Sequence, residues 1–586
     1  MEHVPADRPK RRWKRLLIIA IGISLLAGVG WATSPRAKLL RVPESISSSF
    51  DTTIQSVAQH VDQAIQTDMA SHGLAKAKPA NWRTITRRIS LGLIGNGLSL
   101  EEIRVVEQIP EDKRPTWWTE YLLKDRRSSD YLAERWTRAT VGTNVGPFLV
   151  FRRRKYVDWI ADHFEKGTPY DVVVRDILEA TGSWTDAPQV NFLTATMDDA
   201  DNKKPDAIRL AGRTSRAFLA QRIDCLQCHA DYLGRVNFSD SLASGPSESD
   251  GSAADHGIES NLEQVSRTGE QVDFHQLAAF FSGVKMDNPF VGLRNLKPDY
   301  RITYLHDVNE SSVEPTVPYL RELMPEAGDA RHRLAVWVTH PRNKAFARAT
   351  VNRMWAILFG KPLVEPLDSI PLSGPFPPGL EILAEDLASN GYDLKRLIRT
   401  IVCTEVFQRD SRMEQEADSA SVEMDHENHW AVFPLTPLRP EQVAASIHQA
   451  CRIHAIDESS SILSKLELFG GVNDFTKAYG DQGDDEFTQQ SVTIPQRLLV
   501  MNGAYVSERI NNNPVVNAAT RIAQLASNDK VAVETAYLST LNRLPTGGEL
   551  NAFCSRLHET KGSPRTQAMS SIFWALINST EFQWNH

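Results

Sequence analysis

The pattern of apolar and polar positions is helical along most of this chain. Between residues 54 and 69 the apolar side chains fall at steps of three or four positions: Ile54, Val57, Val61, Ile65 and Met69. This spacing puts them on one face of an α-helix, since about 3.6 residues make one turn. The same pattern predicts further helices, among them 82–93, 156–165, 170–180, 380–388, 394–402, 440–451, 494–506, 517–526, 531–541, 547–559 and 565–577.

One internal stretch departs from this helical pattern. In residues 291–318 the apolar side chains nearly alternate with polar ones, as at Tyr300, Ile302 and Tyr304. Alternation with a period of two is typical of a strand with one buried face. The sequence therefore predicts a mainly α protein with two helical domains, 56–290 and 331–586, joined by a small β-containing connector at 291–330.

The amino terminus carries a separate signal. A cluster of five cations, Lys10, Arg11, Arg12, Lys14 and Arg15, directly precedes an apolar run at 16–33 that has no charge. Such a run is just long enough to cross a bilayer as a helix, and the cations favour a cytoplasmic start. We expect residues 1–33 to form a cytoplasmic tip and a transmembrane anchor, 34–55 a linker, and the body to lie extracytoplasmically, on the periplasmic side. A small-x-small triplet at 30–32 leaves a cleaved signal peptide open.

Composition excludes several classes of protein. The chain has 586 residues, 41% hydrophobic residues and a formal net charge of −8. These values are those of a folded globular body and argue against a disordered chain or a polytopic membrane protein. The negative charge and the lack of a basic stripe argue against a nucleic-acid partner. Five cysteines are too few for a disulfide-based scaffold.

The most specific chemical motif is the C-x-x-C-H sequence formed by Cys225, Cys228 and His229. This spacing is typical of covalent haem c attachment, in which two thiols bond the porphyrin and the imidazole ligates the iron. Two other interpretations stay open: a disulfide between the two cysteines, and part of a zinc site that would need a further ligand. If haem is bound, His275 and Met286 are the nearest downstream candidates for a second axial ligand.

Several motifs in the chain match a known pair of domains. One set lies at 87–91, 156–160, 169–171, 225–229 and 277–281, and the other at 346–355, 359–360, 363–368, 391–395 and 578–582. On these residues the chain resembles the planctomycete cytochrome-C-like domain paired with the planctomycete-specific domain, the domains of unknown function 1549 and 1553. The resemblance implies two helical domains outside the cytoplasm, and its name implies haem. The chain departs from many relatives after His229, where Ala230, Asp231 and Tyr232 stand in place of a second histidine.

From these observations we expect a membrane-anchored extracytoplasmic protein that binds a c-type haem and transfers electrons with an unknown partner. One alternative is a scaffold or binding module without haem, in which Cys225 and Cys228 form a disulfide. Another is an accessory to a polymer-degrading hydrolase, for which Asn352, Arg353, Glu365 and Asp368 would line a polar site. The sequence contains no recognised hydrolase or nucleotide-binding motif, so we assign no catalytic residue and leave enzymatic activity open.

Overall fold

A computed structural model describes residues 46–586 of the protein. It leaves out residue 48 and the segments or positions 144–150, 198–203, 233, 235, 241–264, 289–291, 306, 414–423, 458–459, 481–482, 484–486, 488–491 and 512–516. The predicted anchor at 16–33 and most of the linker therefore lie outside the described residues. Within the part that is described, no helix is both long enough and apolar enough to cross a membrane.

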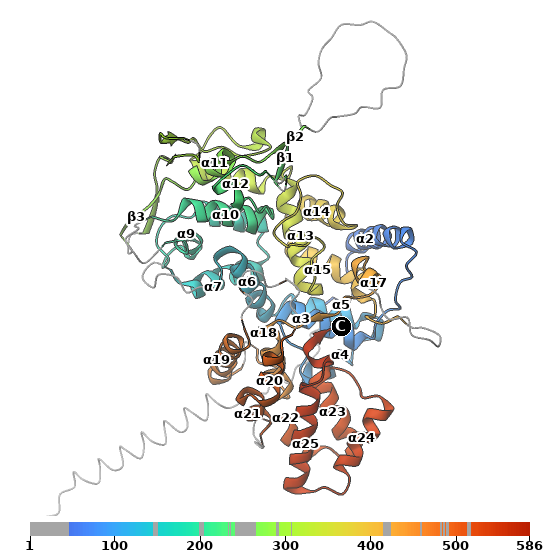
Figure 1. Cartoon of the computed structure of the whole chain (residues 1–586). Coiled ribbons are helices and arrows are strands. Elements are labelled where there is room, and N and C mark those ends of the chain that lie inside the picture. Colours follow the sequence, from blue (N-terminus) through green and yellow to red (C-terminus); the bar gives the residue numbers. More distant parts are fainter. Residues whose placement is uncertain are drawn as a thin grey trace, which may run out of the picture.

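The described chain is mainly helical, as the apolar pattern predicts (Figure 1). The first helices are α2 (Thr52–Ser71), α3 (Trp82–Ile94), α4 (Leu100–Val106), α5 (Arg114–Leu122), α6 (Arg126–Val141), α7 (Arg153–Lys166), α8 (Tyr170–Leu178), α9 (Asn191–Thr194), α10 (Ala207–Leu219) and α11 (Gln271–Ala279). They are followed by α12 (Ala330–Thr339), α13 (Lys344–Phe359), α14 (Leu380–Ser389), α15 (Leu394–Cys403), α16 (Glu405–Gln408), α17 (Met424–Asn428) and α18 (Pro440–Ala450). The last are α19 (Ile462–Tyr479), α20 (Ile494–Asn502), α21 (Ala504–Ile510), α22 (Ala518–Leu525), α23 (Asp529–Leu541), α24 (Gly547–Leu557) and α25 (Gly562–Ile577).

Two details differ from the helices expected from the sequence. The single helix expected at 494–506 is divided into α20 and α21 because Gly503, with φ −70° and ψ 150°, has an extended backbone. Helix α19 was not expected at all. Few of its residues are buried, so its apolar residues do not mark a single core-facing stripe. Short 3₁₀ turns complete the set: η1 (Glu111–Lys113), η2 (Pro188–Val190), η3 (Asp224–Gln227), η4 (Arg321–Leu323) and η5 (Glu581–Gln583).

Strands are short and pair only two at a time among the described residues. The antiparallel pairs are β1 (Asn237–Asp240) with β2 (Val265–Thr268), β3 (Val284–Asn288) with β4 (Gly292–Asn295), β5 (Arg301–Ile302) with β6 (Ser311–Ser312), and β7 (Thr436–Pro437) with β8 (Trp584–Asn585). Strands β4, β5 and β6 fall in the predicted connector, so β structure there is confirmed. The alternating residues do not build a sheet with a buried face, since Val308 is almost fully exposed.

Helix α13 stands at the centre of the larger core (Figure 1). Every residue from Ala345 to Phe359 is buried, and the helix packs against α3, α10, α14 and α15. At Gly92 of α3 an added Cβ would come within 2.8 Å of a methyl carbon of Leu358, so a glycine permits this close approach. One continuous apolar core thus contains residues from Val61 to Phe433, and it includes parts of both predicted helical domains.

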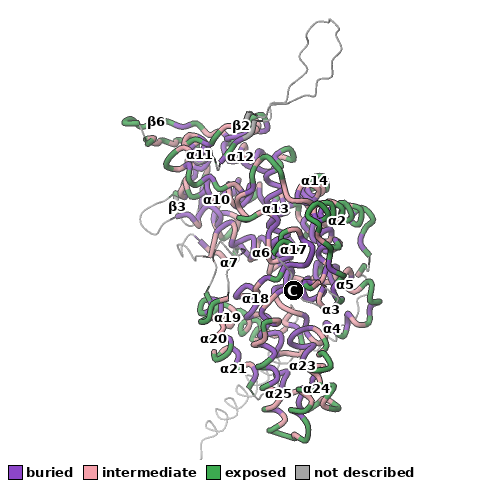
Figure 2. The backbone as a smooth tube through the Cα atoms, turned by 45° about the vertical axis from the view of Figure 1, so that its right-hand side comes forward, coloured by how far each residue is buried: buried purple, intermediate pink, exposed green. Residues whose placement is uncertain are grey.

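A second, smaller core is formed by the carboxyl-terminal helices from α18 to α25. In Figure 2 the buried residues run through the middle of the molecule, while the outer sides of α2 and α24 are exposed. The chain end returns to α3: the side chain of Arg88 donates to the carbonyl oxygens of His586, Phe407 and Arg409. Arg88 is fully buried, and these bonds satisfy the guanidinium that burial has removed from water.

Candidate functional site

The C-x-x-C-H motif forms a short turn on the surface, which we call the cysteine turn (residues 224–229). Helix α10 ends at Ala220, whose φ of 50° reverses the chain direction, and η3 then carries Cys225. Leu226 points inward and is fully buried. Beneath it lies Gly269, where an added Cβ would come within 2.7 Å of the Leu226 side chain. Leu226 therefore anchors the turn to the body, and Cys225 and Cys228 flank it in the sequence.

The three motif side chains face solvent. Cys225 and Cys228 are exposed and both are free thiols. The Nδ1 atom of His229 is 2.6 Å from the carbonyl oxygen of Ala230, so Nδ1 carries the proton and donates it. The imidazole stacks on the ring of Tyr232, with centroids 5.7 Å apart. In this tautomer Nε2 keeps its lone pair, which is the state in which an imidazole binds a metal.

A buried histidine supports the cysteine turn from below. His275 on α11 donates from Nε2 to the carbonyl oxygen of Gln227 at 3.0 Å. Its Nδ1 then accepts the hydroxyl of Tyr300 at 2.8 Å. Gln271, also on α11, donates a second hydrogen bond to the same Gln227 carbonyl at 3.1 Å. Burial lowers the pKa of His275, so the neutral tautomer that makes both bonds is the stable one.

The two predicted axial ligands, His275 and Met286, are both buried and contact other residues. Both ring nitrogens of His275 are engaged, and the side chain is fully buried under the turn rather than facing the thiols. Met286 is buried on β3, where it lies opposite Leu293 of β4. No hydrogen bond or ring contact of the described residues links Met286 to the motif. A second axial ligand from either residue stays a prediction.

Partial burial and nearby carboxylates raise the pKa of the first thiol of the motif. The pKa of Cys225 is raised above its usual value, first by burial and then by the negative charges of Asp231 and Asp224. Asp231 is itself buried and accepts the backbone N–H of Val236 at 2.5 Å. A redox-active C-x-x-C pair relies on a lowered thiol pKa, and zinc requires thiolates. The shift of the Cys225 pKa is therefore opposite in direction to the one typical of a redox-active pair.

A cavity of about 250 Å³ lies beside the cysteine turn, at the junction of α10 with the loop after α13. We call it the arginine cavity, and its charged lining residues are Arg213, Arg216, Arg222, Arg353, Glu365 and Asp368. Arg222 pairs with Asp368 at 2.6 Å, and Arg216 with Asp224 of the turn at 3.4 Å. Four guanidinium groups against two lining carboxylates leave this cavity positively charged.

The cavity gathers three of the four residues expected to form a polar site. Arg353, Glu365 and Asp368 line it, whereas Asn352 is fully buried and bonds the backbone of Val364 through both its amide atoms. Asn352 therefore positions the loop instead of facing the cavity. The sequence analysis missed the arginines of α10. Their one-turn spacing at positions 213 and 216 was a visible signal, but only folding places them opposite residues 353–368.

The residues of the turn fit a covalently attached haem. Both thiols are free and exposed, and the His229 tautomer leaves Nε2 for an iron ion. The neighbouring loop adds the apolar side chain of Leu305, which is exposed. The backbone N–H of Leu305 donates to Gln271, the residue that also bonds the turn. A flat apolar group placed on this corner would cover side chains that are now unfavourably exposed to water.

Comparison with known families finds two matches along the chain. Residues 60–243 match the model of PSCyt2, described as a protein of unknown function (DUF1549). Residues 330–460 match the model of PSD1, described as a protein of unknown function (DUF1553). No curated protein and no solved structure matches the chain. The cysteine turn lies within the first match, and the arginine cavity is lined from both.

Proposed function

We propose that this chain, which carries a PSCyt2 domain and a PSD1 domain, is a membrane-anchored electron-transfer protein with one covalently attached haem c. In this proposal Cys225 and Cys228 bind the porphyrin and His229 ligates its iron. Residues 16–33 would hold the body on the outer side of the membrane, as their charge pattern favours. The two domain matches carry no function of their own, so the proposal rests on the chemistry of the cysteine turn.

The observation that carries the proposal is the state of His229. Its Nδ1 donates to the Ala230 carbonyl, while the two thiols three positions apart stay free and exposed. A histidine that ligates a metal through one nitrogen usually donates from the other to a carbonyl or carboxylate. The ring orientation that iron ligation needs is thus already set by the backbone of the turn and by stacking on Tyr232.

The attachment reaction balances without an external oxidant or reductant. Each thiol adds across one vinyl group of haem: the sulfur bonds one vinyl carbon, the thiol hydrogen goes to the other, and the carbon–carbon double bond becomes single. A neutral thiol supplies both atoms, which agrees with the raised pKa of Cys225. The bound haem supplies one-electron chemistry. With haem bound, Cys225 and Cys228 would hold it through two thioethers and His229 would ligate its iron.

The test is expression of the full chain together with a haem-attachment system. We expect a Soret band that survives extraction with acidified acetone, and a protein mass increased by one haem. Cys225→Ala and Cys228→Ala should each reduce the thioether bonds to one, and the double variant should lose covalent pigment. Cys554→Ala is the matched control, because Cys554 is another free cysteine outside the motif. A colourless wild-type protein would overturn the proposal, and a Cys225–Cys228 disulfide found by mass spectrometry would favour the scaffold alternative.

A second candidate function follows from the arginine cavity. Its four arginines and two carboxylates favour a small anionic ligand, such as one bearing a carboxylate, phosphate or sulfate group. The accessory role expected for polymer-degrading enzymes would use such a site. Calorimetric titration with inorganic phosphate and sulfate tests it, with Arg353→Gln as the variant and Arg342→Gln, an exposed arginine outside the cavity, as the control. Equal binding by both variants, or none by the wild type, would remove this function.

A further inference from the structure

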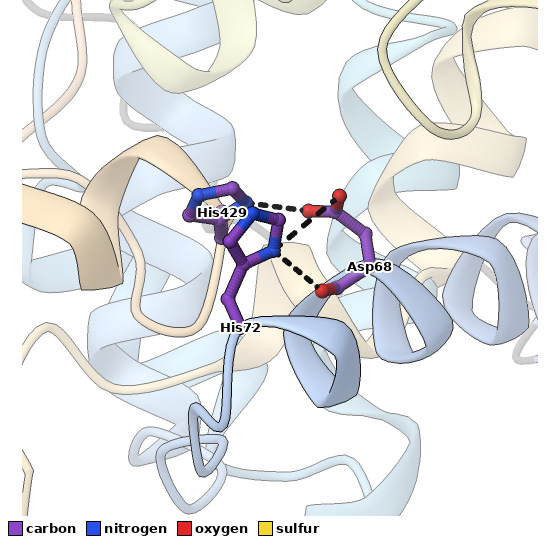
Figure 3. Close-up of side chains that lie close together, drawn as sticks. All are labelled: Asp68, His72 and His429. Carbon is purple, nitrogen blue, oxygen red and sulfur yellow. Dashed lines mark hydrogen bonds and ion pairs between the residues drawn. The ribbon is translucent and has the colours of Figure 1, made fainter.

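We propose that Asp68, His72 and His429 form a binding site for a divalent transition-metal ion, with zinc as the best fit. We call these residues the His–Asp cluster (Figure 3). They come from two parts of the chain that are 361 positions apart: the last turn and C-cap of α2, and the residue that follows α17. The cluster lies outside the cysteine turn and the arginine cavity, so this inference does not depend on the proposed function.

The three side chains offer one ligand atom each within 4.8 Å of one another. The Nδ1 atom of His429 is 2.6 Å from Oδ2 of Asp68. Nδ1 of His72 donates to the backbone carbonyl oxygen of Asp68 at 2.9 Å and lies 3.8 Å from Oδ1 of the carboxylate, so a metal ion would replace that backbone hydrogen bond. Figure 3 shows both rings turned toward Asp68. Bonds of about 2.0–2.2 Å to a tetrahedral zinc ion put ligand atoms about 3.4 Å apart, so small rotations of these side chains suffice.

The two rings lie close enough together to share one metal ion with Asp68. His72 and His429 have centroids only 3.8 Å apart, with their planes at 31°. Two imidazolium ions at this distance would repel each other, and a single carboxylate balances only one positive charge. Two neutral imidazoles that share one divalent ion with a carboxylate avoid this conflict, since the metal takes the place of the proton between His429 and Asp68.

The ligand set selects the kind of metal. Two imidazole nitrogens and one carboxylate oxygen suit zinc and its neighbours in the transition series, whereas calcium and magnesium prefer oxygen ligands alone. His72 has half of its side chain exposed, while Asp68 and His429 are about a quarter exposed. The fourth position therefore faces solvent, where a water molecule can complete the coordination.

The position of the cluster assigns it a structural role. Helix α2 packs its apolar face on α14 and α15, and Asp62 accepts the backbone N–H groups of Glu405 and Val406. Near the end of α2, Ala77 donates its N–H to the carbonyl of Ala431. A metal held by Asp68, His72 and His429 would fasten the carboxyl end of α2 to the chain after α17. We infer that the ion clamps the first described helix onto the body.

The test uses the full-length chain with Cys225→Ser and Cys228→Ser, so that zinc cannot bind at the cysteine turn. Isothermal titration with Zn²⁺ should show one site, and Co²⁺ should give a visible d–d spectrum of a site with nitrogen and oxygen ligands. His72→Gln and His429→Gln should each weaken zinc binding at least about tenfold and remove the rise in melting temperature that zinc causes. His60→Gln is the matched control, because His60 is an exposed histidine on the same helix.

Two results would overturn the proposal: no zinc binding by the chain with intact histidines, or binding that His72→Gln leaves unchanged. His72 is exposed enough that its substitution should not impair folding, and circular dichroism of the metal-free variant checks this. If His429→Gln fails to fold, His72→Gln alone still decides. Loss of haem attachment does not affect this test, and loss of zinc binding does not affect the haem test.

Discussion

The cysteine turn and the His–Asp cluster both gather, among the described residues, side chains of the kinds that bind metals, and they are built in opposite ways. In the turn, Cys225, Cys228 and His229 are near neighbours in sequence, and their spacing alone places them together. In the cluster, Asp68 and His429 meet only because α2 docks on the body 361 positions away. A site formed by a turn needs local support, whereas a site formed by docking depends on the stability of the whole interface.

The supports of the two sites reflect this difference. Beneath the turn lie Leu226 and the hydrogen bonds that His275 and Gln271 make to one carbonyl. Beneath the cluster lie the apolar face of α2 and Arg409, which bridges the helix to the chain near Trp430. The two sites should therefore respond to different substitutions.

The largest effect should come from Arg409→Ala. This buried side chain donates to the carbonyl oxygen of Trp430 at 2.5 Å and approaches the sulfur of Met69 at 3.2 Å. Its removal leaves the carbonyl unpaired and a hole under α2, so we expect a loss of about 3–4 kcal/mol in the free energy of unfolding. Urea denaturation measures it, with the exposed Arg412→Ala as control. Zinc binding should weaken, while alkylation of Cys225 should be unchanged. A change in both would show that the sites are coupled.

His275→Leu should disturb the turn and spare the cluster. The substitution removes two buried hydrogen bonds and leaves the hydroxyl of Tyr300 without its acceptor, which should cost about 2 kcal/mol. We also expect a lower yield of covalent haem, because the Gln227 carbonyl loses one of its two donors. Denaturation and the pyridine haemochrome spectrum measure these effects. A variant as stable as the wild type, with full haem yield, would mean that the turn forms without support from α11.

The free energy of unfolding should depend on pH through Asp62, a residue of helix α2. Burial is the main cause that raises the pKa of Asp62 from 3.8 to about 6. The folded state then binds this proton more tightly than the unfolded state, so the contribution to stability is full below the unfolded pKa and is lost as pH rises through about 6. Because Asp62 is partly solvated, we expect about 1 kcal/mol between about pH 4 and about pH 7.5. Asp62→Asn should flatten this slope in urea titrations. An unchanged slope would contradict the assignment.

The smallest effect is expected from Tyr300→Phe. This change removes only the hydroxyl that donates to Nδ1 of His275. One buried hydrogen bond of this kind contributes about 1 kcal/mol to stability. Thermal or urea unfolding detects it, and Tyr304→Phe is the control, since the ring of Tyr304 contacts His275 edge-on. Equal stability of the two variants would show that the Tyr300 hydroxyl does not fix the tautomer of His275.

Local signals in the sequence predicted much of the fold. The repeat of apolar residues at three and four positions predicted α2 and α15 nearly to the residue, because each of these helices buries one apolar face. The prediction lost accuracy where burial does not follow one face. Helix α19 exposes apolar residues such as Leu466 and Phe469, so the period of the pattern carries little information there.

The candidate sites likewise contain some residues that the sequence predicts and others that it does not. Spacing alone brought Cys225, Cys228 and His229 together, and it placed Arg353, Glu365 and Asp368 near one another through a helix and the loop that follows it. Nothing in the sequence distinguishes His275 as the support of the cysteine turn, because its partners Gln227 and Tyr300 lie 48 and 25 positions away. The His–Asp cluster was equally invisible, since any of 16 histidines could have met Asp68.

The sequence by itself determined the helical character of this protein, the presence of the cysteine turn and the matches of residues 60–243 and 330–460 to two family models. These features depend on residues within one or two turns of each other, where backbone geometry fixes the distances. Only the tertiary structure decided which tautomers His229 and His275 adopt, that arginines of α10 face the loop after α13, and that α2 brings Asp68 to His429. Such contacts join segments through the packing of a shared core, and their distances are set by that core rather than by the chain between them.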